Sequence, residues 1–234
     1  MNDEAINLSK ISYTIIPGKN CPSEHSQLYD AAYNFWFHFW SQVYLENGAT
    51  AKPNPDDFFR QDFIPIIHSD NTIIAMHLYS LFELNCSSIF HQSYLEHNFS
   101  AEYFKIINDN NITSVMTMES LSVNLIFRKS HLGLSLGKVI GILGQKLFLT
   151  ETTCDSIICP ARKDVKVSDM AQEAGFRVIV PNQYLHNTPV DLLMCKRSDI
   201  IEPKDFEVRR LVDILWKKRT LIKGRNLKIA NAAA

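Results

Sequence analysis

The chain has 234 residues, of which 46% are hydrophobic and 21% are charged, and its formal net charge is −1 at pH 7. This length can bury a substantial core, and the nearly balanced charge gives no general attraction to nucleic acid or anionic membranes. The five cysteines contain no Cys-x-x-Cys pair, which argues against a disulfide framework and against a zinc site.

No apolar run approaches the about 18 residues that a membrane-spanning helix needs. The first ten residues are polar and acidic, unlike a signal peptide. We therefore expect a cytoplasmic protein with no transmembrane segment, no nucleic-acid partner and no metal.

The first half of the chain alternates short strand patterns with helical patterns. A β-branched run at residues 11–18 ends in Pro-Gly, which predicts a strand followed by a turn. Apolar residues recur at spacings of three and four over residues 23–47, which predicts an amphipathic helix. Residues 54–63 begin with Asn-Pro and predict a second short helix. Residues 63–84 predict two strands around a Ser-Asp-Asn turn.

The predicted helix at residues 23–47 has an unusually aromatic face. Large aromatic side chains at helical spacing usually belong to a core, and a ligand pocket is the alternative interpretation. The residues concerned are Trp36, Phe37, Phe39 and Trp40.

The second half predicts a helical insert followed by alternating strands and helices. The insert consists of short helices at residues 87–98 and 100–111. The expected order is then β-α-β-α-β-β, which makes the chain an α/β or α+β domain with a mixed sheet. The predicted elements are a long strand at 114–127, a helix that begins near 138, a strand at 154–161, a helix at 167–175 and strands at 176–180 and 189–197.

The stretch FRKSHLGLSLGKVIG, residues 127–141, joins the long strand to its helix. Gly133, Ser135 and Gly137 recur at every second position there. Small residues let backbone N–H groups approach a ligand closely, and the N-terminus of a helix attracts anions. The stretch therefore predicts a turn that cradles a phosphate group.

This order of elements, with a small-residue turn before a helix, resembles the GNAT superfamily of N-acyltransferases over roughly residues 10–200. IICPARKD followed by VSDMAQEAGF resembles the family's fifth strand, its loop and a helix that ends in Gly-Phe. LHNTPVDLLMCKR resembles the final strand. The resemblance implies a mixed, mostly antiparallel central sheet flanked by helices. It divides the chain into a GNAT-like domain at residues 1–200 and a basic C-terminal helical extension at 201–234.

The family's turn has the pattern Arg/Gln-x-x-Gly-x-Gly/Ala, whose backbone N–H groups and helix dipole hold a pyrophosphate. Two registers fit this chain, residues 132–137 with a helix that begins at Lys138, or residues 130–135. The Arg/Gln position is lost in both registers, and one glycine position is Ser135. We prefer the first register because it places three apolar residues on the inner face of the helix, Ile140, Leu143 and Leu147.

The resemblance implies a thioester donor. This donor is either an acyl-CoA, acetyl or longer, or the phosphopantetheine of an acyl carrier protein, which GNAT-like synthases of N-acyl amino acids and acyl-homoserine lactones use. Backbone groups near Ile126 and Phe127 would hold the pantetheine arm, and the aromatic first helix could line an acyl pocket. The candidate phosphate-binding residues are Arg128, Lys129, Gly133, Ser135, Gly137 and Lys138.

Three residues are candidates for proton transfer. Glu119 matches the fourth-strand glutamate that serves as general base in the histone-acetyltransferase members, and a solvent-facing strand residue is the alternative. The helix position at which some relatives carry a general-acid tyrosine is Ala171 here. Tyr184 and His186, in the loop before the last strand, are candidate substitutes, and histidine titrates near neutrality.

Arg162 directly follows the predicted fifth strand. It is a candidate to bind a carboxylate on the acceptor, and the alternative is an ion pair with Asp164 or Asp169.

The C-terminal segment, residues 202–228, predicts a basic amphipathic helix. The helix either packs on the domain with its basic face in solvent or docks an acidic partner, such as an acyl carrier protein or anionic lipid headgroups. The expected apolar stripe is Phe206, Leu211, Leu215 and Trp216.

Together these features predict a transferase that moves an acyl group from an acyl-CoA or acyl-carrier-protein thioester to the amine of a small molecule. The alternative is a catalytically degenerate GNAT-like module that binds a ligand or a protein partner. The lost arginine position and Ala171 favour the alternative, whereas Glu119 and the strand order favour the enzyme.

Overall fold

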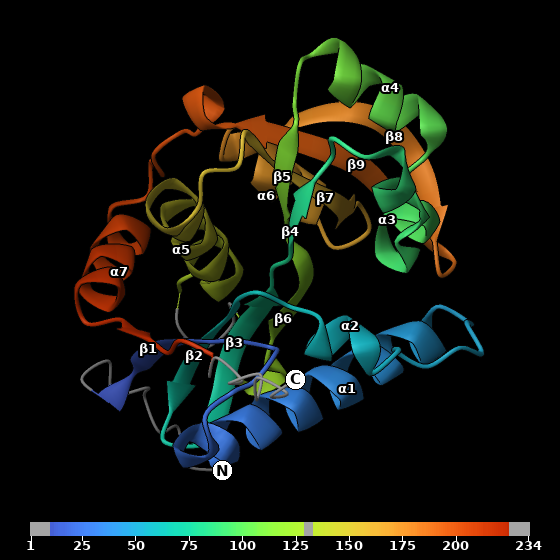
Figure 1. The fold of residues 1–234 in the computed structure, drawn as a ribbon. Helices are drawn as coiled ribbons and strands as arrows, with labels where there is room; N and C mark the ends of the chain where they lie inside the picture. The colour runs from blue at the N-terminus through green and yellow to red at the C-terminus, as the bar shows by residue number, and fades with distance from the viewer. Residues whose placement is uncertain (1–9, 129–132, 225–234) are drawn as a thin grey trace, which may run out of the picture.

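The structure is a computed structural model that describes residues 10–128 and 133–224. Its ten strands form two sheets of five strands each (Figure 1). The first sheet has the order β10-β1-β2-β3-β6 and consists of β1 (Ser12–Ile16), β2 (Ile64–Ser69), β3 (Thr72–Leu78), β6 (Glu119–Val123) and β10 (Thr220–Leu221). The second sheet has the order β4-β5-β7-β9-β8 and consists of β4 (Leu81–Glu83), β5 (Ser114–Thr117), β7 (Ser156–Arg162), β8 (Arg177–Leu185) and β9 (Thr188–Lys196).

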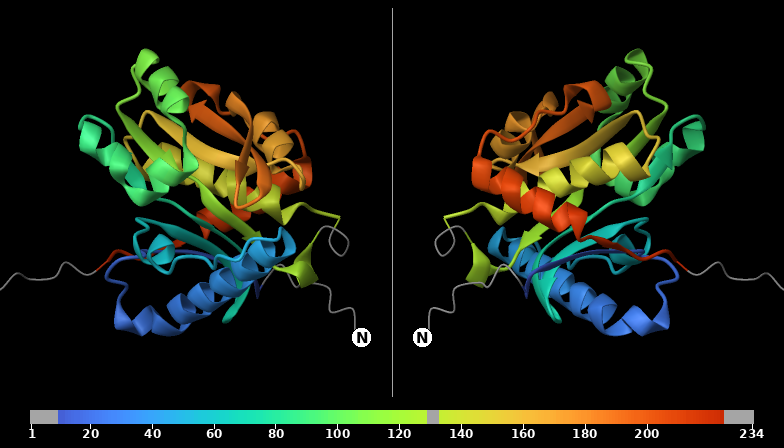
Figure 2. Two further views of the ribbon diagram at one scale, coloured as in Figure 1. Left: turned by 90° about the vertical axis from the view of Figure 1, so that its right-hand side faces the viewer. Right: turned by 90° about the vertical axis from the view of Figure 1, so that its left-hand side faces the viewer.

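Helices cover both sheets. One face of the first sheet packs against α1 and the opposite face against α5, with α7 beside α5 (Figure 2). The second sheet contacts α4 at β8 and α6 at β7 and β9. None of the described helices is long and apolar enough to cross a membrane. The helices are α1 (Ser26–Glu46), α2 (Asp56–Phe59), α3 (Ser93–Asn98), α4 (Ala101–Asp109), α5 (Leu136–Glu151), α6 (Val167–Glu173) and α7 (Phe206–Lys217).

The two sheets separate because the chain changes sheets at Met118. The β5 strand pairs in parallel with β7, and β6, which begins one residue after Met118, pairs antiparallel with β3. The Met118 N–H donates a hydrogen bond of 3.0 Å to the carbonyl oxygen of Ile158 on β7. Beyond that bond β6 follows β3 while β7 follows β9, so a gap opens between β6 and β7. The expectation of one continuous strand at residues 114–127 is therefore wrong.

A β-bulge in β6 lies at the start of this gap. Met76 pairs with Ser122 and Leu78 with Glu119, so one residue of β3 faces two residues of β6. Ser120 in the bulge has a positive φ of 55°, which is uncommon for a residue with a side chain. The indole of Trp40 on α1 supports the bulge, because its Nε1–H donates to the Ser122 hydroxyl at 2.9 Å.

Pro160 lies on β7 where the gap has opened. In a strand, the backbone N–H and C=O groups of every second residue point to the same side. The backbone nitrogen of Pro160 therefore points to the side on which the Ile158 carbonyl accepts a hydrogen bond from Met118. Proline has no N–H to give to a neighbouring strand and is found in strands where such a neighbour is missing. Because β6 diverges from β7, Pro160 lies at a position of β7 that has no described strand beside it on this side.

The core of the first sheet depends on α5. Ile140, Leu143 and Leu147 are fully buried, as the preferred register predicts. The helix begins at Leu136, two residues before the expected start at Lys138, because the Ser135 side chain caps it. This cap satisfies the Lys138 N–H at a distance of 3.4 Å.

The C-terminal segment packs on the domain in the structure. Buried apolar residues of α7 face α5 and β1, and β10 pairs in parallel with β1. Phe206 is 62% exposed, so it does not belong to the predicted apolar stripe. The residues that α7 buries are Val208, Leu211, Val212 and Leu215.

Two glycines of α5 test how tightly this helix packs. A Cβ on Gly144 would overlap the Tyr79 hydroxyl and lie 2.7 Å from the Met118 side chain, whereas a Cβ on Gly141 would meet nothing within 4 Å. We expect Gly144→Ala to lower the free energy of unfolding by about 1–3 kcal/mol through overpacking. We expect Gly141→Ala, the matched control, to raise it by about 0.5–1 kcal/mol through helix propensity. Urea denaturation measures both changes, and equal effects would show that α5 does not approach β3 this closely.

Candidate functional site

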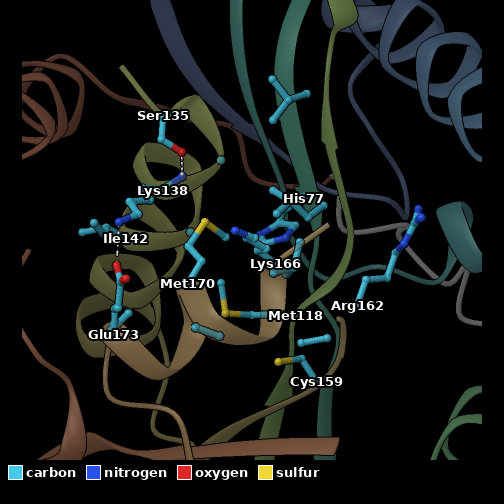
Figure 3. Close-up of a pocket in the computed structure, with 18 of the residues that line it drawn as sticks. His77, Met118, Ser135, Lys138, Ile142, Cys159, Arg162, Lys166, Met170 and Glu173 are labelled. Atoms are coloured by element: carbon cyan, nitrogen blue, oxygen red, sulfur yellow. Dashed lines mark hydrogen bonds and ion pairs between the residues drawn. The ribbon is translucent and has the colours of Figure 1, made fainter. Parts of the chain in front are cut away.

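Two cavities open where β6 and β7 separate. The larger cavity has a volume of about 730 Å³ and lies between the gap and helices α5 and α6 (Figure 3). The smaller cavity has a volume of about 110 Å³ and lies among α1, α3 and the β8–β9 hairpin. Four residues line both cavities, so the cavities adjoin at the gap: Trp40, Ser120, Pro160 and Arg162.

The predicted phosphate turn lies at the mouth of the larger cavity. Gly133 has a φ of +61°, a left-handed conformation that favours glycine. Ser135, Gly137 and Lys138 all line the cavity, and Ser135 is the N-cap of α5. The first N–H groups of a helix lack partners within the helix. The Ser135 side chain accepts the hydrogen bond of the Lys138 N–H, so the N–H groups of Leu136 and Gly137 remain for a ligand.

The basic candidates differ in their positions. Arg128 lines the larger cavity, with its guanidinium carbon 5.9 Å from the centre of the Phe39 ring. Lys138 forms an ion pair with Glu173 across the cavity at 2.5 Å (Figure 3). Lys129 lies outside the described residues.

Ile126 and Phe127 do not lie on a strand. Residues Leu125–Phe127 form a 3₁₀ turn after the end of β6, and the Ile126 side chain is 71% exposed. Neither Ile126 nor Phe127 lines either cavity. Their expected role beside the pantetheine arm assumed a strand that continues to residue 127. In the structure β6 ends at Val123, so neither residue has a strand backbone to offer.

Two buried polar side chains face the mainly apolar interior of the larger cavity. His77 on β3 is hydrogen-bonded through Nδ1 to the Tyr79 hydroxyl at 2.9 Å, and burial lowers the pKa of His77 to about 3, so its ring is neutral at pH 7. The Gln145 amide donates to the Ala174 carbonyl oxygen at 2.8 Å. Its Oε1 has no hydrogen-bond partner among the described residues.

Charged residues divide unevenly between the two cavities. The larger cavity is lined by five basic residues and two acidic ones, whereas the smaller cavity is lined by two acidic residues and one basic one. The larger cavity therefore favours an anionic ligand and the smaller one a cationic ligand. The basic residues of the larger cavity are Arg128, Lys138, Arg162, Lys166 and Lys204, and the acidic residues of the smaller one are Asp57 and Glu119.

Glu119 lies at the wall of the smaller cavity and is only 4% exposed, so it is not a solvent-facing strand residue. Arg60, just after α2, forms a two-pronged ion pair with it, including a bond of 3.0 Å from Nη1 to Oε1. The Thr117 hydroxyl donates to Oε1 at 2.5 Å and the Gln61 amide donates to Oε2 at 3.2 Å.

These four hydrogen bonds fill the acceptor positions of the Glu119 carboxylate. Burial raises the pKa of Glu119 above its ordinary value, and the Arg60 guanidinium opposes that shift. As arranged, Glu119 holds α2, β5 and β6 together. It can accept a substrate proton only when one of the four bonds gives way.

The β8–β9 hairpin closes the smaller cavity from the other side. His186 and Asn187 at its tip both have positive φ, as a two-residue type I′ turn requires. The His186 ring stacks on Tyr44 of α1 with 4.3 Å between ring centres, and it lines the cavity. Burial lowers the pKa of His186, so the ring is neutral at pH 7. Tyr184 is 73% exposed and lines neither cavity.

Arg162 lies at the end of β7 and forms the ion pair with Asp164 that was the alternative from sequence, with its Nε 3.0 Å from the carboxylate. Its side chain extends away from the other labelled residues of the larger cavity (Figure 3).

Sequence reasoning missed two residues near Glu119, its ion-pair partner Arg60 and Tyr94, which lines the smaller cavity. Arg60 belongs to a short polar segment, and Tyr94 to the helical insert. Neither stands in a motif, and only the tertiary structure brings them to Glu119. The expected aromatic face of α1 was the one available signal, since Trp36, Trp40 and Tyr44 line this cavity.

No family model matches the sequence, and no curated protein is significantly similar to it. Solved structures are similar in fold. The acyl-homoserine lactone synthase BjaI, a CoA-dependent enzyme solved with SAM and isopentyl-CoA, has a TM-score of 0.58 at 8% identity over 93% of this chain and 95% of its own. FeeM, an N-acyl amino acid synthase from uncultured soil microbes, has a TM-score of 0.54 at 8% identity over 81% of this chain and 93% of its own. The chain has the GNAT fold.

An agmatine N-acetyltransferase mutant shares the GNAT fold with this chain at a TM-score of 0.56 and 9% identity, over 80% of this chain and 99% of its own. The fold class expected from sequence is confirmed, with α3 and α4 as the helical insert and α7 as the C-terminal helix. Among the described strands most pairs are antiparallel, and β1–β10 and β5–β7 are the parallel ones. The strands of the expected mixed sheet form two five-stranded sheets, which the gap between β6 and β7 separates.

Within the described part of the chain, no three histidine, cysteine or carboxylate side chains come together in a way that would hold a metal ion.

The Arg60–Glu119 ion pair leads to a prediction about the free energy of unfolding. Removing one partner of a buried ion pair leaves an uncompensated charge and costs about 3–5 kcal/mol. We expect Glu119→Gln and Arg60→Gln each to lower the free energy of unfolding by an amount in that range. The double variant should lose less than the sum, by at least about 1 kcal/mol, because neither charge is then left alone. Chemical denaturation of the four proteins measures the coupling, and strictly additive losses would contradict it.

Proposed function

We propose that the protein is an N-acyltransferase, which moves an acyl group from a pantetheine thioester to the amine of a small molecule. The observation that supports this most is the pair of cavities adjoining at Ser120 and Pro160 in the gap between β6 and β7. Such an arrangement brings two separately bound reactants together at one point, which is the main requirement of an acyl transfer.

The donor belongs in the larger cavity. Its phosphate groups would bind the uncapped N–H groups at the start of α5, assisted by Arg128 and Lys138, and the basic lining favours their charge. The pantetheine arm would lie along the free edges of β6 and β7. The acyl group would then extend into the apolar interior beside Met118 and Ile142.

Both donor classes fit this assignment. An acyl-CoA presents more phosphate charge to the basic residues than the single phosphate of a carrier protein. A carrier protein would also need a docking surface, and the exposed basic residues of α7 are the candidate, among them Arg209 and Arg210. The similarity to BjaI, a CoA-dependent enzyme solved with isopentyl-CoA, supports CoA-linked acyl donors as the class to test first.

The chemical step is a substitution at the thioester carbonyl carbon. The neutral amine forms the new C–N bond, the C–S bond breaks, and the thiol leaves. A bulge leaves one residue of the longer strand outside the ladder, so a backbone N–H near Ser120 is available to polarise the carbonyl oxygen. The amine loses one proton, and one proton reaches the departing sulfur.

His186 is the proton acceptor that this geometry favours. It lines the smaller cavity, where the amine would bind, its ring is neutral at pH 7, and it stacks on Tyr44. Glu119 is already fully hydrogen-bonded and positions Arg60, so its role as direct base stays a prediction. The general-acid role of Tyr184 and the carboxylate-binding role of Arg162 also stay predictions.

A binding module without catalysis is the second candidate. It is favoured by Ala171 at the position of the family's acid tyrosine, and by the lost arginine in the turn. Such a module would bind a pantetheine thioester without forming an amide, and mass spectrometry of reactions with a panel of amines separates the two.

The larger cavity can be blocked at Gly141, which lines it on α5 and has open space around its Cβ position. We expect Gly141→Phe to weaken binding of acetyl-CoA or long-chain acyl-CoA at least tenfold by filling the cavity. Gly141→Ala should bind the donor as the wild type does. Thermal stabilisation by each donor is the measurement, and unchanged binding to the phenylalanine variant would place the donor elsewhere.

The role of His186 predicts a pH dependence. Deprotonation of the amine raises log kcat/KM with pH throughout, and protonation of His186 adds a second loss at low pH. The lowered pKa puts that extra loss below pH 6.5. We expect the plot of log kcat/KM against pH to become steeper below pH 6.5 in the wild type. His186→Asn should have a lower rate overall and should lack this steeper part of the plot. An identical steepening in both proteins would rule out His186.

A further inference from the structure

Two residues that line the smaller cavity each carry a buried hydrogen-bonding group that the described part of the chain leaves without a partner. These groups are the indole Nε1–H of Trp36 on α1 and the hydroxyl of Tyr94 on α3. Trp36 is 2% exposed and Tyr94 is 8% exposed. Both side chains belong to well-packed clusters, so neither can turn to solvent to find a partner.

A buried polar group without a partner costs about 1–3 kcal/mol. Tyr13, Ser41 and Ser156 carry such groups as well but line neither cavity, and Gln145 carries one at the larger cavity. The coincidence of two of them in one small cavity, beside Glu119, therefore points to a ligand that completes their hydrogen bonds.

The chemistry of the two groups restricts that ligand. An indole N–H can only donate, so the ligand must present an acceptor atom to Trp36. Burial raises the pKa of Tyr94 well above its ordinary value, so the phenol keeps its proton and can also donate. An oxygen acceptor on the ligand suits either group.

The charges around the cavity select against a carboxylate. Asp57 and Glu119 contribute negative charge to the lining. These two acids share one cation, since both form ion pairs with Arg60, and Arg162 is paired with Asp164. A ligand carboxylate would meet two acids and no unpaired cation among the described lining residues, whereas an uncharged oxygen avoids that repulsion.

We infer that the acceptor is a small primary amine that carries an uncharged hydrogen-bond-accepting oxygen, such as a hydroxyl, ether, ester or amide group. The oxygen binds Trp36 and Tyr94, and the amine points to the junction at Ser120 and Pro160. The inference rests on the proposed function. The thioester and this amine give an amide and a free thiol: the C–N bond forms, the C–S bond breaks, and one amine proton ends on sulfur.

Matched amines test the inference. 2-Methoxyethylamine and n-butylamine have the same chain length, and the ether oxygen accepts hydrogen bonds without donating. We expect wild-type kcat/KM for the ether amine to exceed that for butylamine at least tenfold, and that for β-alanine, which carries a carboxylate, by more. 2-Aminoethanol and propylamine form a second, shorter pair with the same expected order.

Variants test whether the preference for the oxygen-bearing amine depends on the Trp36 indole and the Tyr94 hydroxyl. Trp36→Phe removes the indole N–H and Tyr94→Phe removes one oxygen atom, and each should reduce the ratio within a pair severalfold. Tyr13→Phe is the control, because it removes an equally buried, unpartnered hydroxyl away from both cavities. If Trp36→Phe fails to fold, Tyr94→Phe alone carries the test.

A second readout separates this inference from the proposed function. Binding of the same amines without a donor is followed by thermal stabilisation, where each oxygen-bearing amine should stabilise the wild type more than its hydrocarbon partner. Absence of acylation with every donor and amine would overturn the proposed function alone. Equal or absent responses within both pairs, or a preference for β-alanine, would overturn the inference.

Discussion

The divergence of β6 from β7 beyond the Met118–Ile158 hydrogen bond is the constraint on which the rest of the structure depends. It divides the strands into two sheets and opens both cavities. It also explains two local features that would be unfavourable elsewhere, a proline within β7 and a positive φ at Ser120. A strand pair left unjoined exposes backbone groups on both edges, and an extended pantetheine arm is the kind of ligand that can satisfy them.

Two sets of interactions keep the gap in place from the α1 side. Trp40 bonds the bulge through its indole, and the buried Arg60–Glu119 pair connects α2 to the first residue of β6. One residue of each set, Trp40 and Glu119, also lines the smaller cavity. The same side chains thus support the fold and shape the proposed amine site, so a variant at either position needs a stability measurement beside any activity measurement.

Local patterns were sufficient to predict most of the elements, because α1, the β2–β3 hairpin, α5, α6 and β9 each have a clear period and clear ends. The change of sheets at Met118 was not predicted, although the apolar alternation changes phase there: apolar residues stand at 116 and 118, and then at 121 and 123, as expected for a bulge at Glu119 and Ser120. Pro160 was a second signal, because a proline inside an apolar strand implies a missing neighbour. Glu119 was selected from the resemblance, but its partner Arg60, and Tyr94 whose ring lies under the Arg60 guanidinium, come from remote segments that only the tertiary structure brings together.

The central claim is that the gap between β6 and β7 holds the pantetheine arm of an acyl donor. A crystal structure with a non-hydrolysable acyl-pantetheine thioether tests it most directly, because CoA and carrier-protein donors share that arm. We expect the arm between β6 and β7, with its amides bonded to their backbones and its acyl end beside Met118. An arm bound elsewhere, or a gap that stays empty at saturating analogue, would contradict the account.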